Sequence, residues 1–516
     1  MKRELFSIIA ICCSLAAWSD NIVFADANVK ALCVANWDTN SDGELSEVEA
    51  AVVTDLENVF KNSKITAFNE LQYFIGLTDI TEGAFRYCSN LTSITIPISV
   101  KYIEEDAFVG CSGLTSVHIN DLVSWCSISF DGKSSNPLSY AHHLYLNGEE
   151  IKDVVIPNNI SILKNYSFSG GYYLTSVIIP NSVTAIGYGT FAGCTGITNI
   201  IIPESVTSIG EGVFLGCTKL ESVTLPNTLT SIPAYTFAWC TALTTLNMPS
   251  NLISIGSQAF YECSSLTSLS IPNSVEDVSS LAFDGCAWYE NKDDGLVYIG
   301  RVAYKYKGTM PSGTEIVIQD GTLLIASSAF SSCKGLSSVT FPNSLTTIGN
   351  SAFEYCEGLG SVTLPLGLKT IENNAFIHSN VQSVKIPSSV TTIGNYAFWS
   401  CPLKTVEVHI PNPLPITNQT FGISLNSATL YVPYGCKSAY GKNLWWSYFQ
   451  IVEMPLLGDV NNDGEVDAQD ASLVLQYVAK KIDSIEIENA DVNNDGNVDA
   501  QDASLILQYV AKKITW

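Results

Sequence analysis

Two twelve-residue segments near the C-terminus carry oxygen ligands at the spacing that a calcium ion requires. They read DVNNDGEVDAQD (459–470) and DVNNDGNVDAQD (491–502). In each, side-chain oxygens fall at loop positions 1, 3, 5, 9 and 12, position 7 offers its backbone carbonyl, and a glycine makes the sharp turn. The predicted ligands of the first loop are Asp459, Asn461, Asp463, Glu465 (through its carbonyl), Asp467 and Asp470. Those of the second loop are Asp491, Asn493, Asp495, Asn497 (through its carbonyl), Asp499 and Asp502.

The charge of these two loops predicts folding that depends on a cation. Four ligand carboxylates within one loop repel one another unless a metal ion neutralises them, so calcium binding and folding are expected to be coupled. An acidic, exposed turn is the alternative interpretation, but the complete pattern occurs twice, which favours calcium. Each loop leads into a stretch with apolar residues at helical spacing, expected to be helical at 471–481 and 503–513.

A third loop of the same kind lies near the N-terminus, at 38–49. The glycine of the turn is Gly43, and the predicted ligands are Asp38, Asn40, Asp42, Glu44 (through its carbonyl), Ser46 and Glu49. Because position 12 is a glutamate and apolar helical stretches lie on both sides, the loop resembles that of an EF-hand. The alternative is an acidic turn that caps a helix. We predict a calcium-binding cap with a structural rather than a sensing role.

Between the N-terminal loop and the two C-terminal loops, the sequence repeats with a period of 23 residues. The phrase LTSVIIP (174–180) returns as ITNIIIP, LESVTLP, LTTLNMP and LTSLSIP. Each turn has the pattern L-x-x-L-x-L followed by a phenylalanine, and no single turn could bury this set, whereas stacked turns form one continuous core. The sequence therefore predicts a leucine-rich-repeat solenoid, with a parallel β-sheet on one side and an irregular or short-helical convex side. Two insertions, near 121–153 and 288–308, interrupt the period, and both contain hairpin signals, Asn147-Gly148 and Gly300.

Ten of the 15 cysteines keep the phase of the repeat, three residues after its phenylalanine. A disulfide framework is one interpretation for a secreted protein. A column of small, buried hydrophobic side chains is the other, and the identical phase in every turn favours free, buried thiols. These cysteines are Cys88, Cys111, Cys194, Cys217, Cys240, Cys263, Cys286, Cys333, Cys356 and Cys401.

Composition narrows the classes of partner. The 516 residues include 50 acidic and 25 basic side chains, a formal charge of −25, which argues against nucleic acid and anionic membranes as partners. The N-terminus combines Lys2 and Arg3 with an apolar run from Leu5 to Trp18, which predicts a secretory signal cut after Ala25. A transmembrane anchor is the alternative, but a span needs about 20 apolar residues. We therefore predict an extracellular protein without a membrane span.

Signatures of catalysis are missing from the sequence. None of the five histidines forms a His-Glu-x-x-His site, and Gly-x-Ser-x-Gly does not occur. The adjacent His142 and His143 lie in the first insertion, where a loop surface is favoured over a metal site. A pair of catalytic carboxylates stays open as an alternative, because such acids can be far apart in the chain. We predict that the protein is not an enzyme.

Two resemblances join these observations. The 23-residue Leu-Pro-Phe-Cys pattern, over about 64–453, resembles the BspA-like leucine-rich-repeat family of bacterial surface proteins, which implies binding or adhesion to a protein or glycan. From Gly458 onward the duplicated loop and helix look like a type I dockerin, which implies a cohesin partner on a scaffold or cell surface. The usual Ser-Thr recognition pair is here Ala-Gln. The recognition positions implied by this resemblance are Ala468, Gln469, Leu475, Gln476, Lys480, Ala500, Gln501, Leu507, Gln508 and Lys512.

The sequence thus predicts five segments: a signal peptide (1–25), an EF-hand-like cap (26–63), the solenoid (64–435), a C-terminal cap and linker (436–455) and a small, all-α, calcium-binding dockerin (456–516). The predicted function is that of a secreted, non-catalytic binding or adhesion protein, docked to a cohesin. The alternative is an enzyme or enzyme subunit of a cellulosome-like, polysaccharide-degrading complex.

Overall fold

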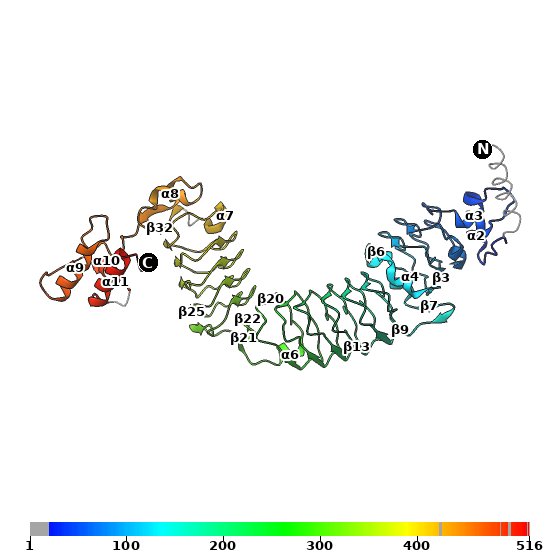
Figure 1. Ribbon diagram of the computed structural model, residues 1–516, viewed down its shortest axis with the longest axis horizontal. Coiled ribbons are helices and arrows are strands. Elements are labelled where there is room, and N and C mark those ends of the chain that lie inside the picture. The colour runs from blue at the N-terminus through cyan, green and yellow to red at the C-terminus, as the bar shows by residue number, and fades with distance from the viewer. Residues whose placement is uncertain (1–19, 423–425, 486, 494–496, 513, 515–516) are drawn as a thin grey trace. The chain divides into compact units, whose positions relative to one another are not determined.

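The computed structural model describes residues 20–422, 426–485, 487–493, 497–512 and 514 (Figure 1). The chain divides into two compact units, the first ending at Asp293 and the second beginning at Asp294. None of the helices in these described ranges is long and apolar enough to cross a membrane. Residues 1–19 of the predicted signal peptide lie outside the described residues.

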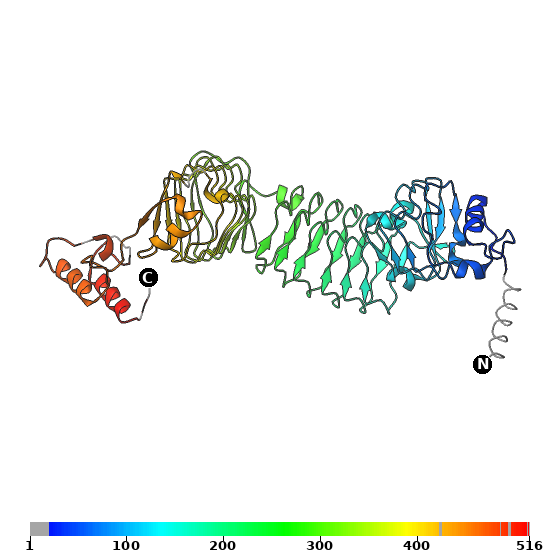
Figure 2. The same ribbon diagram turned by 90° about the horizontal axis from the view of Figure 1, so that it is seen from above.

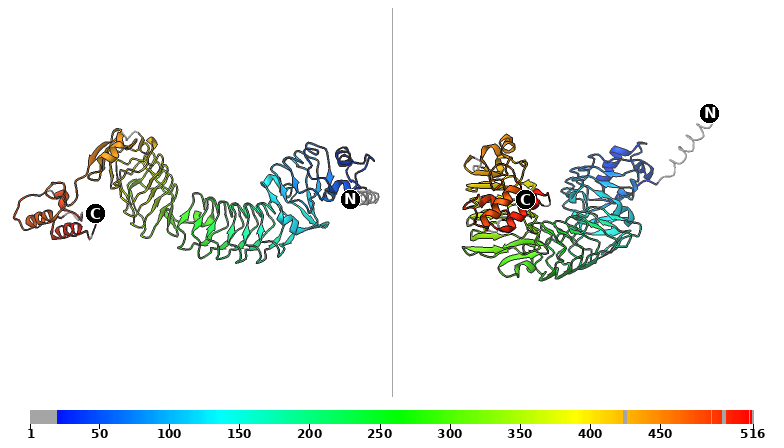
Figure 3. Two further views of the ribbon diagram at one scale, coloured as in Figure 1. Left: turned by 45° about the horizontal axis from the view of Figure 1, so that its top comes forward. Right: turned by 60° about the vertical axis from the view of Figure 1, so that its left-hand side comes forward.

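Each solenoid turn of the first unit contributes one strand of about three residues to one parallel sheet and a two-residue strand to another (Figure 3). In a strand such as Ser222–Thr224 the middle residue is buried and its neighbours are exposed, because alternate strand residues share a face. The register advances by one repeat per turn, since Asn199 pairs with Ser222 and Ser222 pairs with Thr245. The predicted parallel solenoid is confirmed, and the side expected to be irregular or short-helical carries turns and the second ladder of short strands.

The longer strands of the first unit form three groups. They are β1 (Ala67–Phe68), β3 (Ser93–Thr95), β5 (Ser116–Ile119), β7 (Leu144–Leu146) and β8 (Glu149–Glu150); β9 (Asp153–Val155) and β11 (Ser176–Ile178); and β13 (Asn199–Ile201), β15 (Ser222–Thr224), β17 (Thr245–Asn247) and β19 (Ser268–Ser270). The short strands are β2 (Asp79–Ile80), β4 (Tyr102–Ile103), β6 (Ser129–Phe130), β10 (Ile162–Leu163), β12 (Ala185–Ile186), β14 (Ser208–Ile209), β16 (Ser231–Ile232), β18 (Ser254–Ile255) and β20 (Asp277–Val278). The helices are α2 (Ala27–Trp37), α3 (Glu47–Ala51), η2 (Asn69–Tyr73), α4 (Leu122–Ser127), η3 (Lys133–Ser135), α5 (Leu138–Ala141) and α6 (Ala287–Glu290).

The second unit repeats this arrangement and then changes to helices. Its first sheet holds β21 (Gly295–Ile299), β22 (Val302–Lys307), β24 (Leu324–Ile325), β26 (Thr347–Ile348), β28 (Thr370–Ile371) and β30 (Thr392–Ile393). The longer strands are β23 (Thr314–Val317), β25 (Leu336–Thr340), β27 (Ser361–Thr363), β29 (Ser383–Ile386), β31 (Thr405–Val408), β32 (Thr429–Val432) and β33 (Gln450–Glu453). The helices are α7 (Asn418–Phe421), α8 (Lys437–Lys442), η5 (Trp446–Tyr448), α9 (Ala468–Val478), α10 (Ile487–Ala490) and α11 (Ala500–Val510).

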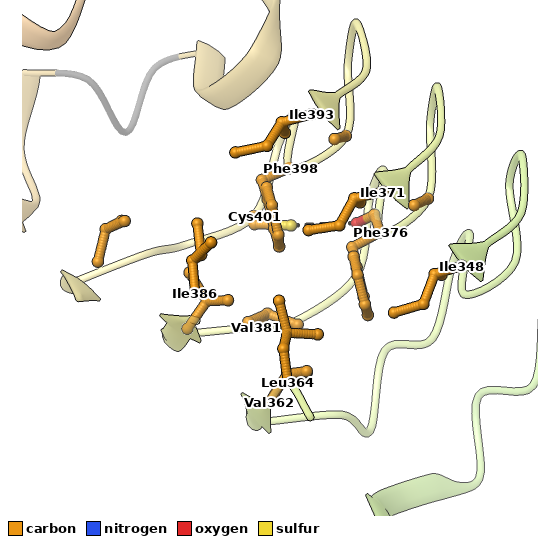
Figure 4. Packing of buried hydrophobic residues seen from close by; sticks show 14 of the residues in the cluster. Ile348, Val362, Leu364, Ile371, Phe376, Val381, Ile386, Ile393, Phe398 and Cys401 are labelled. Atoms are coloured by element: carbon orange, nitrogen blue, oxygen red, sulfur yellow. Dashed lines mark hydrogen bonds between the residues drawn. The ribbon is translucent and has the colours of Figure 1, made fainter. Parts of the chain in front are cut away.

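A ladder of phenylalanine rings fills the core of each unit. In the second unit the ring centroids of Phe353 and Phe376 lie 5.0 Å apart, and those of Phe376 and Phe398 lie 5.2 Å apart, with interplanar angles of 4° (Figure 4). Trp446 closes this ladder against Phe421, and its indole nitrogen donates a hydrogen bond to the carbonyl of Leu414. The repeat therefore buries one aromatic ring per turn against its neighbours, which a single turn could not do.

The cysteine column follows the phenylalanine ladder. Cys401 donates from its sulfur to the carbonyl of Phe376 in the preceding turn at 3.1 Å (Figure 4). In the first unit, Cys240 donates in the same way to the carbonyl of Phe214 at 3.2 Å. All the cysteines in the described ranges are free, which confirms the prediction of free thiols, although Cys333 is only half-buried. Burial raises the pKa of the Cys217 thiol to about 12, so this thiol stays protonated and unreactive at neutral pH.

Side-chain hydrogen bonds attach the first insertion to the next turn of the solenoid. Trp125 and Asn136 donate to the carbonyls of Ser167 and Tyr166, at 3.0 and 2.7 Å. His142 donates from Nδ1 to the carbonyl of Gly170 at 2.9 Å. In a regular turn the carbonyl directly before the repeated phenylalanine, which is the position of Ser167, accepts from the backbone of the preceding turn, as the carbonyl of Thr190 does from Phe168. The insertion therefore replaces a missing turn, and His142 has a structural partner.

Both predicted hairpins are confirmed. In β7–β8, Tyr145 pairs antiparallel with Glu150, and the turn residues Asn147 and Gly148 both have positive φ, at 51° and 89°, as a type I′ turn requires. In β21–β22, Gly295 pairs antiparallel with Lys307.

Candidate calcium loops and docking surfaces

The first C-terminal loop is closed by hydrogen bonds to its predicted ligands. Asp459 is buried, and its two carboxylate oxygens accept from the backbone N–H groups of Asp463 and Gly464 at 3.0 and 2.9 Å. Asn461 and Asp463 accept from the backbone two residues ahead, at 2.9 and 3.0 Å. Gly464 has φ +91°, a conformation that favours glycine, so the predicted turn lies at this residue.

Asp470, at loop position 12, ties the two ends of the loop together. It is fully buried, and its Oδ1 accepts from the backbone of Val460 at 2.7 Å while its Oδ2 accepts from that of Asp467 at 2.8 Å. Asp467 in turn accepts from Gln469 at 2.6 Å and caps α9. This capping starts α9 at Ala468, three residues before the predicted start, so loop and helix overlap.

A buried asparagine fastens the first loop to α10. The side-chain amide of Asn489 donates to the backbone carbonyl of Asp459 at 2.6 Å, and the backbone carbonyl of Asn489 accepts from the N–H of Gly458 at 2.8 Å. Asn489 was not among the residues predicted for this site. Its contact spans 30 residues and belongs to no motif, so spacing within the loop gave no signal for it.

The second loop repeats the closing bonds of the first where it is described. Asp502 is fully buried and accepts from the backbone of Val492 at 3.0 Å and of Asp499 at 2.9 Å. Asp499 accepts from Gln501 at 2.6 Å and caps α11. Asp491, Asn493 and Asn497 lie in the same loop, whereas the predicted ligand Asp495 lies outside the described residues.

The donor set of these loops fits calcium. Every predicted ligand is a carboxylate, amide or carbonyl oxygen, the hard donors that calcium prefers, and softer or nitrogen ligands do not take part. Across the described ranges no group of three or more His, Cys, Asp or Glu side chains already surrounds a common metal position. The backbone N–H groups hold Asp459 and Asp470 within the loop instead, with their oxygens on the side of the loop that closes.

The helices α9 and α11 pack side by side (Figure 2), and residues at equivalent positions of the two are exposed. Val474 and Ile506 occupy the shared core with Val460 and Val492. Leu475 and Leu507, both predicted recognition residues, are each 45% exposed. The remaining predicted recognition residues are exposed, except that Gln476 and Gln508 are half-buried. Val478 and Val510 are also exposed beside them and were not predicted.

The N-terminal loop is closed by hydrogen bonds in the same way. Glu49 is buried, and its Oε1 accepts from the backbone of Thr39 at 2.9 Å while its Oε2 accepts from that of Ser46 at 3.0 Å. Burial by itself raises the pKa of Glu49, but the hydrogen bonds from Ser46 and Thr39 outweigh it and lower that pKa to about 2. Asp38 accepts from Ser41 and Gly43, as position 1 of the first C-terminal loop accepts from its own turn.

The predicted ligands of this loop differ in their partners. Asn40 and Asp42 accept from the backbone two residues ahead, both at 2.8 Å. Glu44 uses its carboxylate for an ion pair with Lys30 at 2.6 Å, which leaves its backbone carbonyl as the predicted donor. Ser46 also caps α3 through a capping box with Glu49, so the alternative role in helix capping operates at the same residues.

The exposed residues of the longer strands form a strand face along the solenoid. Ser222 and Ser268 lie exposed at its first position, as the repeat indicates. At the third residue of three neighbouring strands, Val155, Ile178 and Ile201 form an apolar stripe, with exposed fractions of 60, 60 and 67%. Ser176 donates to the neighbouring Asp153 at 2.5 Å, and this bond, with one from Thr175, lowers the pKa of the Asp153 carboxyl. The carboxyl beside the stripe is therefore ionised at neutral pH.

Comparison with known proteins gives two family matches. The family model described as BspA type leucine rich repeat region matches residues 56–171, 140–237, 161–290 and 297–426, and the model of the dockerin type I domain matches residues 457–511. Type I dockerin domains bind calcium and imply a cohesin partner, and proteins of both kinds are typically extracellular or on the cell surface. No curated protein matches the chain.

Solved structures of bacterial leucine-rich-repeat proteins resemble this chain. A leucine-rich repeat protein from Bacteroides ovatus is 23% identical, with 73% of this chain and 88% of that chain covered and a TM-score of 0.32. A leucine rich cell surface protein from Faecalibacterium prausnitzii is 22% identical, with 69% and 83% covered and a TM-score of 0.28. The pneumococcal vaccine antigen PcpA is 16% identical, with 73% and 85% covered and a TM-score of 0.29. Because the repeat model matches more than half of its length, the chain belongs to the BspA-type leucine-rich-repeat proteins, and it carries a type I dockerin domain at its C-terminal end.

Proposed function

We propose that this protein is secreted, has no catalytic activity, and binds a protein or glycan through its solenoid while its dockerin holds it to a cohesin on a scaffold or cell surface. Docking to a cohesin is supported by the matching exposed faces of the two helices, with Leu475 on α9 and Leu507 on α11. Half-exposed leucines on two helices that already share a core have no partner within that core, and such apolar surface is typical of a binding site.

Calcium would be held by the twelve residues predicted from the two C-terminal loops. The ion would supply the positive charge that lets the loop carboxylates lie close together. Asp470 and Asp502 would fix both ends of their loops, because they already bond the backbone at positions 2 and 9. Asp470 and Asp502 also lie in the first turns of α9 and α11, so loop closure and the position of the docking helices are linked.

The two copies support docking in either of two orientations. The predicted recognition residues of the first copy, Ala468 to Lys480, are identical in type to those of the second, Ala500 to Lys512. Apart from Lys480 and Lys512, which lie two residues beyond the helix ends, both sets lie on helices with the same bounds relative to their loops. A cohesin that accepts one copy therefore meets the same side chains in the other.

The apolar stripe supports a protein as the ligand of the solenoid in this part of the strand face. Ile178 pairs with Val155 across the sheet, and Ile201 lies one period further on, so the three side chains form one surface. Aliphatic groups form no hydrogen bonds with sugar hydroxyls, whereas they suit the apolar centre of a protein interface. The ionised Asp153 beside the stripe favours a partner with a basic group at the edge of the contact.

The N-terminal loop would hold a further calcium ion with a structural role. Its predicted ligands, Asp38 to Glu49, share the closing bonds of the first C-terminal loop, including the bonds from the backbone to the side chain at position 12. The loop leads into α3, which contacts η2 of the first repeats, so an ion here would stabilise the beginning of the solenoid.

Binding of the full-length chain to purified type I cohesins tests this function, by surface plasmon resonance in calcium and then in EDTA. We expect tight binding that EDTA reverses. The Asp470→Ala/Asp502→Ala variant should not bind, whereas Glu465→Gln should bind normally, because the Glu465 carboxylate is not a predicted ligand. Calcium binding without affinity for any cohesin would contradict docking and would leave the dockerin as a stabilising terminal domain.

The alternative is an enzyme or enzyme subunit of a polysaccharide-degrading complex, because dockerins also occur on enzymes. Hydrolysis of plant or host glycans by the full-length chain would favour this alternative. Loss of that hydrolysis on replacing a carboxylate of the solenoid, with cohesin binding intact, would assign the activity to the solenoid.

A further inference from the structure

We propose that the segment Asp20–Ala25 remains in the mature protein as the β-partner of the N-terminal loop, so that the secretory leader is removed before Asp20. This proposal rests on the proposed secretion, and it moves the cut upstream of the position after Ala25 that the sequence alone favours. Residues 20–26 lie within the described part of the chain, and their hydrogen bonds join them to the N-terminal loop and to Glu70.

Backbone hydrogen bonds join this segment to residues 45–47, in the second half of the N-terminal loop. Asn21 forms an antiparallel bridge with Ser46, and the N–H of Ile22 donates to the carbonyl of Leu45 at 2.8 Å. The N–H of Glu47 donates to the carbonyl of Asp20 at 3.3 Å. Leu45 directly follows Glu44, whose carbonyl is a predicted calcium ligand, so the segment fixes the loop beside a ligand position.

The side chains of the segment divide as those of an integral strand do. Ile22 is only 4% exposed, and Leu45 opposite it is fully buried. The next residue, Val23, is 89% exposed. A leader that is cut away has no need of this alternation, whereas a strand that covers a core has. Removal of Ile22 would uncover the apolar surface around Leu45.

A second attachment lies at Ala25. Its N–H donates to Glu70 Oε1 at 2.9 Å, and the other oxygen of this buried carboxylate has no hydrogen-bond partner. A cut after Ala25 would remove this donor from a buried charge. The new ammonium group at Asp26 would offer a substitute donor to Glu70, but it would restore none of the contacts made by Asp20, Asn21 and Ile22. The balance of contacts therefore favours retention.

The sequence allows an earlier cut. Ala17 and Ser19 are small residues with one residue between them, the pattern that precedes a signal-peptide cleavage site, and they lie directly before Asp20. Val23 and Ala25 satisfy the same pattern, so pattern alone does not choose between the two positions.

Expression of the full chain with its own leader in a secreting bacterial host tests the cut, by intact mass and N-terminal sequencing of the secreted protein. We expect the mature chain to begin at Asp20. A chain that begins at Asp26 would overturn the retention of this segment and leave secretion untouched. An uncleaved chain would overturn removal of the leader together with the proposed secretion.

Two adjacent substitutions test the β-partner role without changing the cut. In the full chain, Ile22→Ser should raise amide hydrogen exchange of residues 44–50 at least tenfold, because the strand would no longer be held by its buried side chain. Val23→Ser changes an exposed neighbour and should leave exchange within twofold of the wild type. Equal exchange in both variants would overturn the proposed role.

Discussion

Gly110 and Gly216 occupy the same place in two turns, two residues after the repeated phenylalanine, yet they meet different surroundings. Both have left-handed backbone, with φ of 80° and 71°. A Cβ added to Gly110 would lie 2.3 Å from a ring carbon of Tyr87 in the preceding turn, whereas a Cβ added to Gly216 would meet nothing within 4 Å. The pair separates the cost of backbone conformation from the cost of steric overlap.

We predict that Gly110→Ala destabilises the first unit more than Gly216→Ala does. Each change carries the left-handed cost of about 1 kcal/mol, and overlap with Tyr87 adds about 1–3 kcal/mol at Gly110 only. Urea denaturation of the full chain measures both, since both glycines lie in one unit. Tyr87→Ser should remove most of the added loss in the Gly110→Ala background, and equal losses in the two single variants would contradict this explanation.

Glu49 predicts an acid-dependent stability of the N-terminal cap. Its pKa in the folded protein is about 2, below the ordinary value of 4.5, so it stabilises the fold above pH 4.5, and this contribution is lost as the pH falls towards 2. In calcium-free protein, Glu49→Gln should reduce the loss of thermal stability between pH 5 and pH 2. The exposed Glu47 lies on the same helix, and Glu47→Gln should leave the pH profile unchanged. Identical profiles for the two variants would contradict the role of Glu49.

At the scale of elements, the docking helices predict a redundancy that can be measured. If either copy of the dockerin is able to bind the cohesin, Leu475→Asp alone or Leu507→Asp alone should weaken binding by only about twofold, because one of two equivalent faces remains. The double variant should lose at least a hundredfold, about 2.7 kcal/mol. Isothermal titration with a cohesin that binds the wild type measures all three variants, and unchanged calcium titrations serve as the folding control. A hundredfold loss in one single variant would show that one face alone docks.

The solenoid could be predicted from the sequence because its pattern repeats. Contacts that occur outside the repeat could not be predicted from that pattern. The phenylalanine ladder and the cysteine column follow from the period, because each turn meets an identical neighbour. Asn489 on α10 and Trp125 in the first insertion form bonds across 30 and 42 residues. No periodic pattern indicates such contacts, because each occurs only once and depends on the tertiary fold that brings its two residues together. The second ladder of two-residue strands was missed for another reason: a strand of two residues is too short to show alternation.

At the scale of the whole molecule, the solenoid is divided between two compact units, each with its own ladder of rings. In the first unit one stack runs from Phe60 to Phe108 and another from Phe168 to Phe283, and the first insertion lies between them and bonds to the turn of Phe168. In the second unit the rings run from Phe330 to Phe421. In a repeat protein each turn is stabilised mainly by its nearest neighbours, so cooperativity is strongest within one unbroken stack. The two units therefore give the molecule two candidate cooperative blocks.

Calorimetry of the full chain in calcium should accordingly show separable transitions for the two units. Phe214 and Phe376 are both fully buried and stacked between two rings of their own unit. Replacing either with alanine leaves a cavity that costs about 3–5 kcal/mol, and about 10 °C in the transition of its own unit, at 2–4 °C per kcal/mol. Phe214→Ala should shift one transition and Phe376→Ala the other, with hydrogen exchange assigning each to its residues. If both variants shift one common transition equally, the solenoid unfolds as a single block and coupling through 288–308 is as strong as within the units.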